Sequence, residues 1–133
     1  GADAKDIATI VTAIGNHDEG TGRPVSPMAA ALILADKSDV RRSRVRNQDK
    51  STFDIHDRVN YSISENSVTV DRKARVIRHE LVMDSTSSVL EYTQIYTPRI
   101  IMCEEAAAFL GCSFELVING QTVNNRPTRQ TNK

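Results

Sequence analysis

The chain has 133 residues, of which 39% are hydrophobic and 26% are charged, and its 17 Lys and Arg residues balance 17 Asp and Glu residues. This composition is that of one soluble globular domain, or of two small units that share a core. A formal net charge of zero excludes a general electrostatic attraction to nucleic acid or to membranes. The sequence has neither an apolar run of eighteen residues nor a secretory-type N-terminus, so we expect a cytoplasmic protein without a membrane-spanning segment.

Helical periodicity marks the N-terminal third of the chain. Apolar residues at positions 7, 10, 11 and 14 have helical spacing, and a second apolar run extends from Met28 to Leu34. A loop containing glycine and proline separates the two runs, and Ser26 followed by Pro27 is typical of the start of a helix. The polar stretch 47–52 lacks periodicity and is the best candidate for a linker. We therefore expect residues 1–50 to form a helical segment.

Strand patterns begin after this linker. Apolar and polar side chains alternate over residues 67–84, with residues 71–73 as a polar turn, which predicts a β-hairpin. Residues 88–110 then predict a long helix that ends at Gly111. Pro98 lies inside this helix and leaves two alternatives open: the helix kinks at the proline, or a new helix begins there.

A third strand is predicted after the long helix. Residues 112–118 alternate, and Asn119-Gly120 is a turn signal. The expected fold is therefore α+β, with N-terminal helices followed by a small antiparallel sheet and one long helix in the order β-β-α-β. The α+β lobe would span residues 51–123, and residues 124–133 would form a polar tail.

Two polar side chains stand at positions where the helical pattern predicts burial. His17 lies seven residues after Ile10, and Asp36 lies four residues after Leu32. A buried carboxylate needs a cation, a hydrogen-bond donor or a metal ion, and an imidazole with a carboxylate would be half of a site for a divalent metal. On the residues alone the plainer alternative is favoured, in which His17 ends a helix and Asp36 pairs with Lys37 or a nearby arginine at the surface.

The strongest local charge excess of the chain follows directly. Residues 37–50 contain six Lys and Arg side chains against two aspartates. Guanidinium groups present a planar fork of donors that matches phosphate oxygens, and Arg41 and Arg44 are the pair expected to act together. The alternative is a solvated surface on which these side chains pair with Asp39.

A family resemblance favours the metal hypothesis. The stretch NHDEGTGRPVSP followed by AAALILADKSDVRRSR, within residues 4–46, resembles the later part of the catalytic domain of HD-domain metal-dependent phosphohydrolases. In that family a helix ends in a histidine, a loop with glycine and proline follows, and the next helix carries an Ala-Asp pair whose aspartate is a metal ligand. The resemblance implies that His17 and Asp36 are metal ligands and that Asp18 is a bystander or supports the ligands. The earlier family features, a first histidine and a helix that ends in His-Asp, are absent, so the chain resembles a C-terminal piece of a longer enzyme with an appended α+β lobe.

The resemblance implies hydrolysis of a phosphoester, with a nucleotide or another small phosphorylated molecule as the expected substrate. One or two divalent ions (Mn, Mg, Fe or Zn) would polarise the phosphoryl oxygen and activate water. On this resemblance Lys37, Arg41 and Arg44 would contact the phosphate of the substrate. We expect a homo-oligomer, or association with the missing N-terminal half, because a lone helical half leaves apolar surface exposed. The alternative is a non-enzymatic protein-binding or assembly module. A nucleic-acid partner is less favoured, because the nearest aromatic residue to the arginines in sequence is Phe53.

Overall fold

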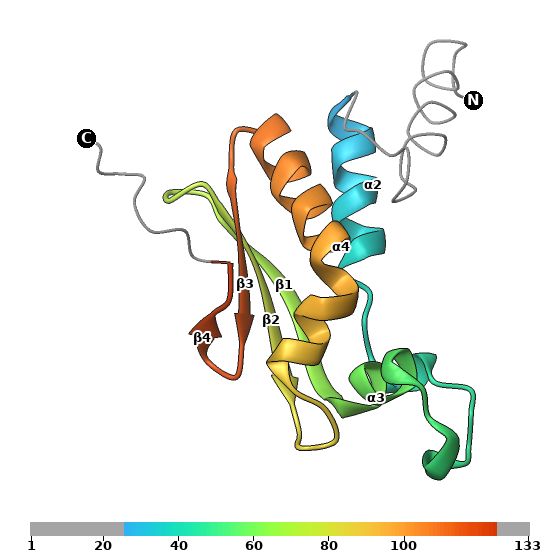
Figure 1. Ribbon diagram of the computed structural model, residues 1–133. Coiled ribbons are helices and arrows are strands. Elements are labelled where there is room, and N and C mark those ends of the chain that lie inside the picture. Colours follow the sequence, from blue (N-terminus) through green and yellow to red (C-terminus); the bar gives the residue numbers. More distant parts are fainter. Residues whose placement is uncertain (1–25, 125–133) are drawn as a thin grey trace, which may run out of the picture.

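The computed structural model describes residues 26–124 (Figure 1). Within this range the elements follow in the order α2 (Pro27–Lys37), η1 (Arg42–Arg44), η2 (Lys50–Thr52), α3 (Ile55–Ser62), β1 (Ile63–Asp71), β2 (Val76–Met83), α4 (Val89–Phe109), β3 (Ser113–Ile118) and β4 (Gln121–Thr122). The predicted α+β class, with one long helix and a small sheet, is confirmed. The predicted first helix and His17 lie outside the described residues.

The sheet is mixed rather than antiparallel as the sequence predicts. Its strand order is β1-β2-β3-β4, and β1 and β2 form the predicted antiparallel hairpin with a turn over residues 72–75. β3 lies parallel to β2, with Val76 opposite Ser113 and Leu81 opposite Ile118. The reason is the long helix α4, which carries the chain back along the sheet, so that the strand after it enters in the same direction as the strand before it. β4 returns antiparallel to β3 after a tight turn.

Local capping residues fix the starts of two helices. Ser26 Oγ accepts a hydrogen bond from the backbone N–H of Ala29 at 3.1 Å, and Pro27 occupies the first turn of α2, as predicted. The sequence pattern does not predict α3, yet this helix begins with a capping box in which Asp54 and Asp57 each accept the other's backbone N–H.

α4 runs through Pro98 as one continuous helix of 21 residues, so no new helix begins at the proline. Ser88 caps its start, accepting the N–H of Glu91. At its end the N–H of Cys112 donates to the carbonyl of Ala107 at 2.8 Å, and Gly111 has a φ of 75°. This left-handed conformation favours glycine, which confirms the predicted helix end.

One core joins α2 to the α+β part of the chain. α2 and α4 pack side by side on the same face of the sheet (Figure 1). The largest fully buried side chains include Ile33 from α2, Leu81 from β2, and Leu116 and Ile118 from β3. No helix in the range 26–124 combines the length and the apolar character that a membrane crossing requires.

Candidate functional site

The predicted metal ligand Asp36 lies in the last turn of α2, with its side chain 45% exposed. The prediction that Asp36 faces the core is wrong, and the alternative, in which Asp36 pairs with Lys37 at the surface, agrees with the structure. The buried face of α2 follows Ala29, Ile33 and Lys37, so Lys37 takes the inward position and its side chain is only 6% exposed. Its Nζ atom lies 2.9 Å from Asp36 Oδ2. The buried ammonium is thus paired with a carboxylate at the surface, as a charge leaving water requires.

Asp39 organises the arginines that follow α2. Its backbone N–H donates to the carbonyl of Asp36 at 3.3 Å, so the loop starts beside that residue. Its carboxylate binds Arg41 Nε through Oδ1 and Arg44 Nη1 through Oδ2, both at 3.1 Å. Arg41 and Arg44 therefore lie together, as the sequence predicts, and they also pair with Asp39, as the alternative interpretation has it. Both arginine side chains are more than half exposed, at 57% and 55%.

A partly buried polar network holds this loop against the sheet. Asn66 of β1 donates through Nδ2 to the carbonyl oxygens of Ser38 and Val40, both at 2.9 Å. Its Oδ1 atom lies 2.8 Å from Nε2 of His79 on β2. Because Oδ1 can only accept, the network assigns the proton to His79 Nε2. Burial lowers the pKa of His79 to about 4, so the ring is neutral at pH 7.

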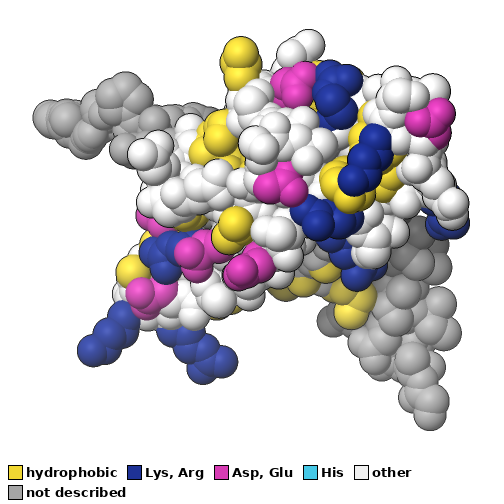
Figure 2. Space-filling model, turned by 90° about the horizontal axis from the view of Figure 1, so that it is seen from below, with side chains coloured by type: hydrophobic (Ala, Val, Ile, Leu, Met, Phe, Trp, Pro, Cys, Tyr) yellow, Lys and Arg dark blue, Asp and Glu magenta, His cyan; other side chains and the backbone are white. Residues whose placement is uncertain are grey.

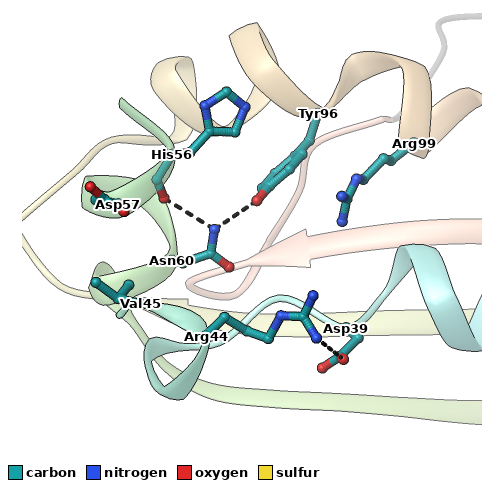
Figure 3. Close-up of a pocket in the computed structure, with 8 residues that line it drawn as sticks. All are labelled: Asp39, Arg44, Val45, His56, Asp57, Asn60, Tyr96 and Arg99. Carbon is teal, nitrogen blue, oxygen red and sulfur yellow. Dashed lines mark hydrogen bonds and ion pairs between the residues drawn. The ribbon is translucent and has the colours of Figure 1, made fainter. Parts of the chain in front are cut away.

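A polar pocket of about 230 Å³ lies beside the loop (Figure 3). Side chains from the loop, α3 and α4 line it: Asp39, Arg44, Val45, His56, Asp57, Asn60, Tyr96 and Arg99. In Figure 3 the guanidinium groups of Arg44 and Arg99 both project toward the space beside Asn60 and Tyr96. The pocket therefore offers two cationic forks from elements that are far apart in sequence.

Asn60 ties the walls of this pocket together. Its Nδ2 atom donates to Tyr96 Oη at 2.7 Å and to the carbonyl of His56 at 3.1 Å, and its Oδ1 atom accepts the backbone N–H of Arg41 at 3.2 Å. The Arg99 guanidinium lies over the Tyr96 ring, 4.7 Å from the ring centroid. These contacts fix α3, α4 and the loop in one arrangement.

Most of these pocket residues are not among the predicted site residues. In the sequence, His56 and His79 together with Asp54 and Asp57 could form a second metal cluster, but such a pattern is more often polar surface. The structure separates that group, because His79 bonds to Asn66 inside the core whereas His56 borders the pocket. The spacing of Asp54 and Asp57 is the one sequence signal that would have revealed α3, and with it Asn60.

Acidic and basic side chains are interspersed around this end of the molecule, which Figure 2 shows from below. Arg42 pairs with Asp84 at 2.7 Å, and its guanidinium carbon lies 4.6 Å from the centroid of the Tyr61 ring. Lys50 Nζ lies 4.5 Å from the same centroid. An aromatic ring thus accompanies the basic cluster after all, and two cations already lie over it. The basic excess of residues 37–50 is therefore offset by neighbouring carboxylates in the folded chain.

The described residues do not form a complete metal centre. No group of three His, Cys, Asp or Glu side chains within residues 26–124 is arranged to hold a metal ion. Asp36 supplies one exposed carboxylate, and His17, its predicted partner, lies outside that range. The part of the site that can be described therefore consists of one candidate ligand, Asp36, and a pocket lined by two arginines.

Comparison with protein-family models, with curated proteins and with solved structures finds no match for this chain.

Proposed function

We propose that this chain forms the substrate-phosphate side of a metal-dependent phosphohydrolase site, to which Asp36 contributes one ligand of a divalent ion. The observation that carries the proposal is the exposed carboxylate of Asp36, followed within one turn by a loop whose arginine Arg44 lines a polar pocket together with Arg99. The resemblance of residues 4–46 to HD-domain phosphohydrolases supplies the reaction class.

A phosphate group would compete with Asp39 for the arginines. Exposed ion pairs contribute at most about 1 kcal/mol, so Arg41 and Arg44 can exchange one anionic partner for another at little cost. A phosphate monoester offers them more charge than a carboxylate and equally suits a bidentate contact. Lys37 is not one of the proposed phosphate contacts, because its ammonium is buried and paired with Asp36.

The size of the pocket limits what it would hold. Sites for whole drug-sized ligands have volumes of roughly 300–1,000 Å³. At about 230 Å³, this pocket suits a phosphate and the group next to it, with the remainder of a nucleotide or other phosphorylated molecule outside. The Tyr96 ring and the Asn60 amide would contact that adjoining group.

The metal ion would activate water and polarise the phosphoryl oxygen when bound. In this chain Asp36 and His17 would be its ligands, and further ligands would come from a chain segment that carries the earlier family features. Among residues 26–124, Asp36 is the one proposed metal ligand, so these residues alone would not hold the metal ion that hydrolysis requires.

Calorimetric titration with Mn²⁺ tests the metal ligand. Asp36→Ala and His17→Ala should each weaken Mn²⁺ binding by roughly tenfold or more, because each removes a ligand. Asp49→Ala is the matched control, since Asp49 is also an exposed aspartate but bonds to Ser51 within its own turn. Mn²⁺ binding that is equally tight in wild type and Asp36→Ala would refute the role of Asp36.

The second candidate function is a protein-binding or assembly module. It is favoured by one observation, the exposed strand β1 at the edge of the sheet. A chain that folds well but binds no Mn²⁺ would favour this function over the first.

A further inference from the structure

β1 offers an open edge for strand pairing. It stands at one end of the strand order, and eight of its nine residues are exposed. Within residues 26–124, β2 is its one strand partner. Every second residue of an edge strand directs its N–H and C=O groups away from the sheet, where another strand can bind them. The tip of the β1–β2 hairpin also projects beyond the helices (Figure 1).

The outer half of β1 lacks the devices that normally protect such an edge. Proteins block edge pairing with lysine, proline, inward charges or bulges. The stretch from Asn66 to Val70 has no charge and no proline, and the irregularity in β1 lies at its far end, between Ile63 and Glu65. Val68 and Val70 are 45% and 59% exposed, although they stand opposite buried residues of β2. The edge therefore combines open backbone groups with apolar side chains.

We propose that β1 pairs antiparallel with β1 of a second copy of this chain, about a two-fold axis at Thr69, so that two sheets become one. This pairing is independent of the proposed hydrolase function. The two-fold axis is perpendicular to the joined sheet, and side chains that face each other must lie on the same face of that sheet. The axis must therefore lie at a residue position and not between two residues. An axis at Thr69 sets Val68 of each copy opposite Val70 of the other, and the two Thr69 side chains face each other.

Charge complementarity selects this register. With the axis at Thr69, Glu65 of each copy lies level with Lys73, whose long side chain extends from the hairpin turn just beyond β1. With the axis at Val68, Glu65 would stand opposite Asp71, and like charges directly opposite each other are destabilising. With the axis at Ser67, Val68 would face the amide of Asn66, and the two valines would not meet. Of these three registers, the Thr69 register is the one that pairs opposite charges and also sets both valines opposite valines.

Disulfide trapping tests the register. In a Cys112→Ser background, which removes the partly exposed thiol and keeps the buried Cys103, Thr69→Cys and Ser67→Cys form a matched pair on the outer face of β1. Residues facing each other across the axis have Cα atoms about 4.5–5.5 Å apart, which suits a disulfide. In the same register the two copies of position 67 would lie about 14 Å apart, so the thiols of Ser67→Cys would be too distant to bond.

Under mild oxidation with diamide, Thr69→Cys should form covalent dimers faster than Ser67→Cys. Sedimentation velocity should show concentration-dependent self-association of the wild type, because so short a ladder makes a small interface. The exposed substitution Val70→Lys should keep the circular dichroism spectrum and abolish the association. Faster trapping of Ser67→Cys, a wild type that stays monomeric at all concentrations, or a Val70→Lys variant that associates like the wild type would overturn the proposal.

Discussion

Acidification is expected to destabilise this protein through His79. The ring is 2% exposed, its Nε2 atom donates to Asn66 Oδ1, and burial lowers its pKa from 6.5 to about 4. In the unfolded chain the same ring titrates near 6.5. Between pH 6.5 and pH 4 the unfolded chain therefore binds a proton that the folded chain does not. The stabilisation by neutral His79 is full above this window and is lost as the pH falls through it.

The size of the effect follows from the difference between the two pKa values. One pKa unit corresponds to about 1.4 kcal/mol. With pKa values of 6.5 and about 4, the free energy of unfolding should fall by about 2 kcal/mol between pH 7 and pH 5. This is a large part of the stability of a small domain, which is roughly 5–15 kcal/mol.

Urea unfolding followed by far-ultraviolet circular dichroism at pH 7, 6 and 5 measures this loss. His79→Gln keeps a donor for Asn66 but does not titrate, so its stability should change much less over this range. His56→Gln is the matched control, because His56 is exposed and its replacement should leave the pH dependence of the wild type intact. If wild type and His79→Gln lose stability in parallel, the buried neutral ring is not the cause and the reasoning is refuted.

Three further substitutions test the packing. Leu116→Ala removes a fully buried side chain of β3 and should lower the free energy of unfolding by about 2–5 kcal/mol in urea titrations. Gly111→Ala forces a Cβ atom into a φ of 75° and should cost about 1–2 kcal/mol in the same assay, whereas no loss would contradict the left-handed helix end. Asn66→Ala leaves the carbonyls of Ser38 and Val40 without their donor, so it should cost about 1–3 kcal/mol and speed amide hydrogen exchange in that loop; unchanged exchange would refute the network.

The features that could be predicted from the sequence depend on neighbouring residues. The Ser26-Pro27 helix start, Gly111 and the Asn119-Gly120 turn each require a particular residue type at one backbone conformation. The face of α2 could not be predicted. Alanines surround its larger apolar residues, so the periodicity fits more than one buried face. That Lys37 rather than Asp36 takes the inward position depends on the packing of α2 against α4.

The candidate site could not be predicted because the residues that line its pocket are far apart in the sequence. Its pocket joins Arg44 to Asn60 and both to Arg99, and these contacts depend on how α3 and α4 pack. The parallel entry of β3 depends likewise on the crossover by α4. Local patterns carry no information on which distant side chains meet. Arg41 and Arg44 were the exception, since both bind Asp39 within the same short loop.

Whether Asp36 and the arginines serve one phosphoester site is tested most directly by titrating the chain with AMP, with and without Mn²⁺. Wild type, Asp36→Asn and Arg44→Gln would be compared, with Arg72→Gln in the hairpin turn as the control. We predict that Mn²⁺ tightens AMP binding in the wild type, that Asp36→Asn abolishes this gain, and that Arg44→Gln weakens binding by about tenfold or more. An AMP affinity that does not depend on Mn²⁺ and is equal in wild type and Arg44→Gln would contradict the proposed function.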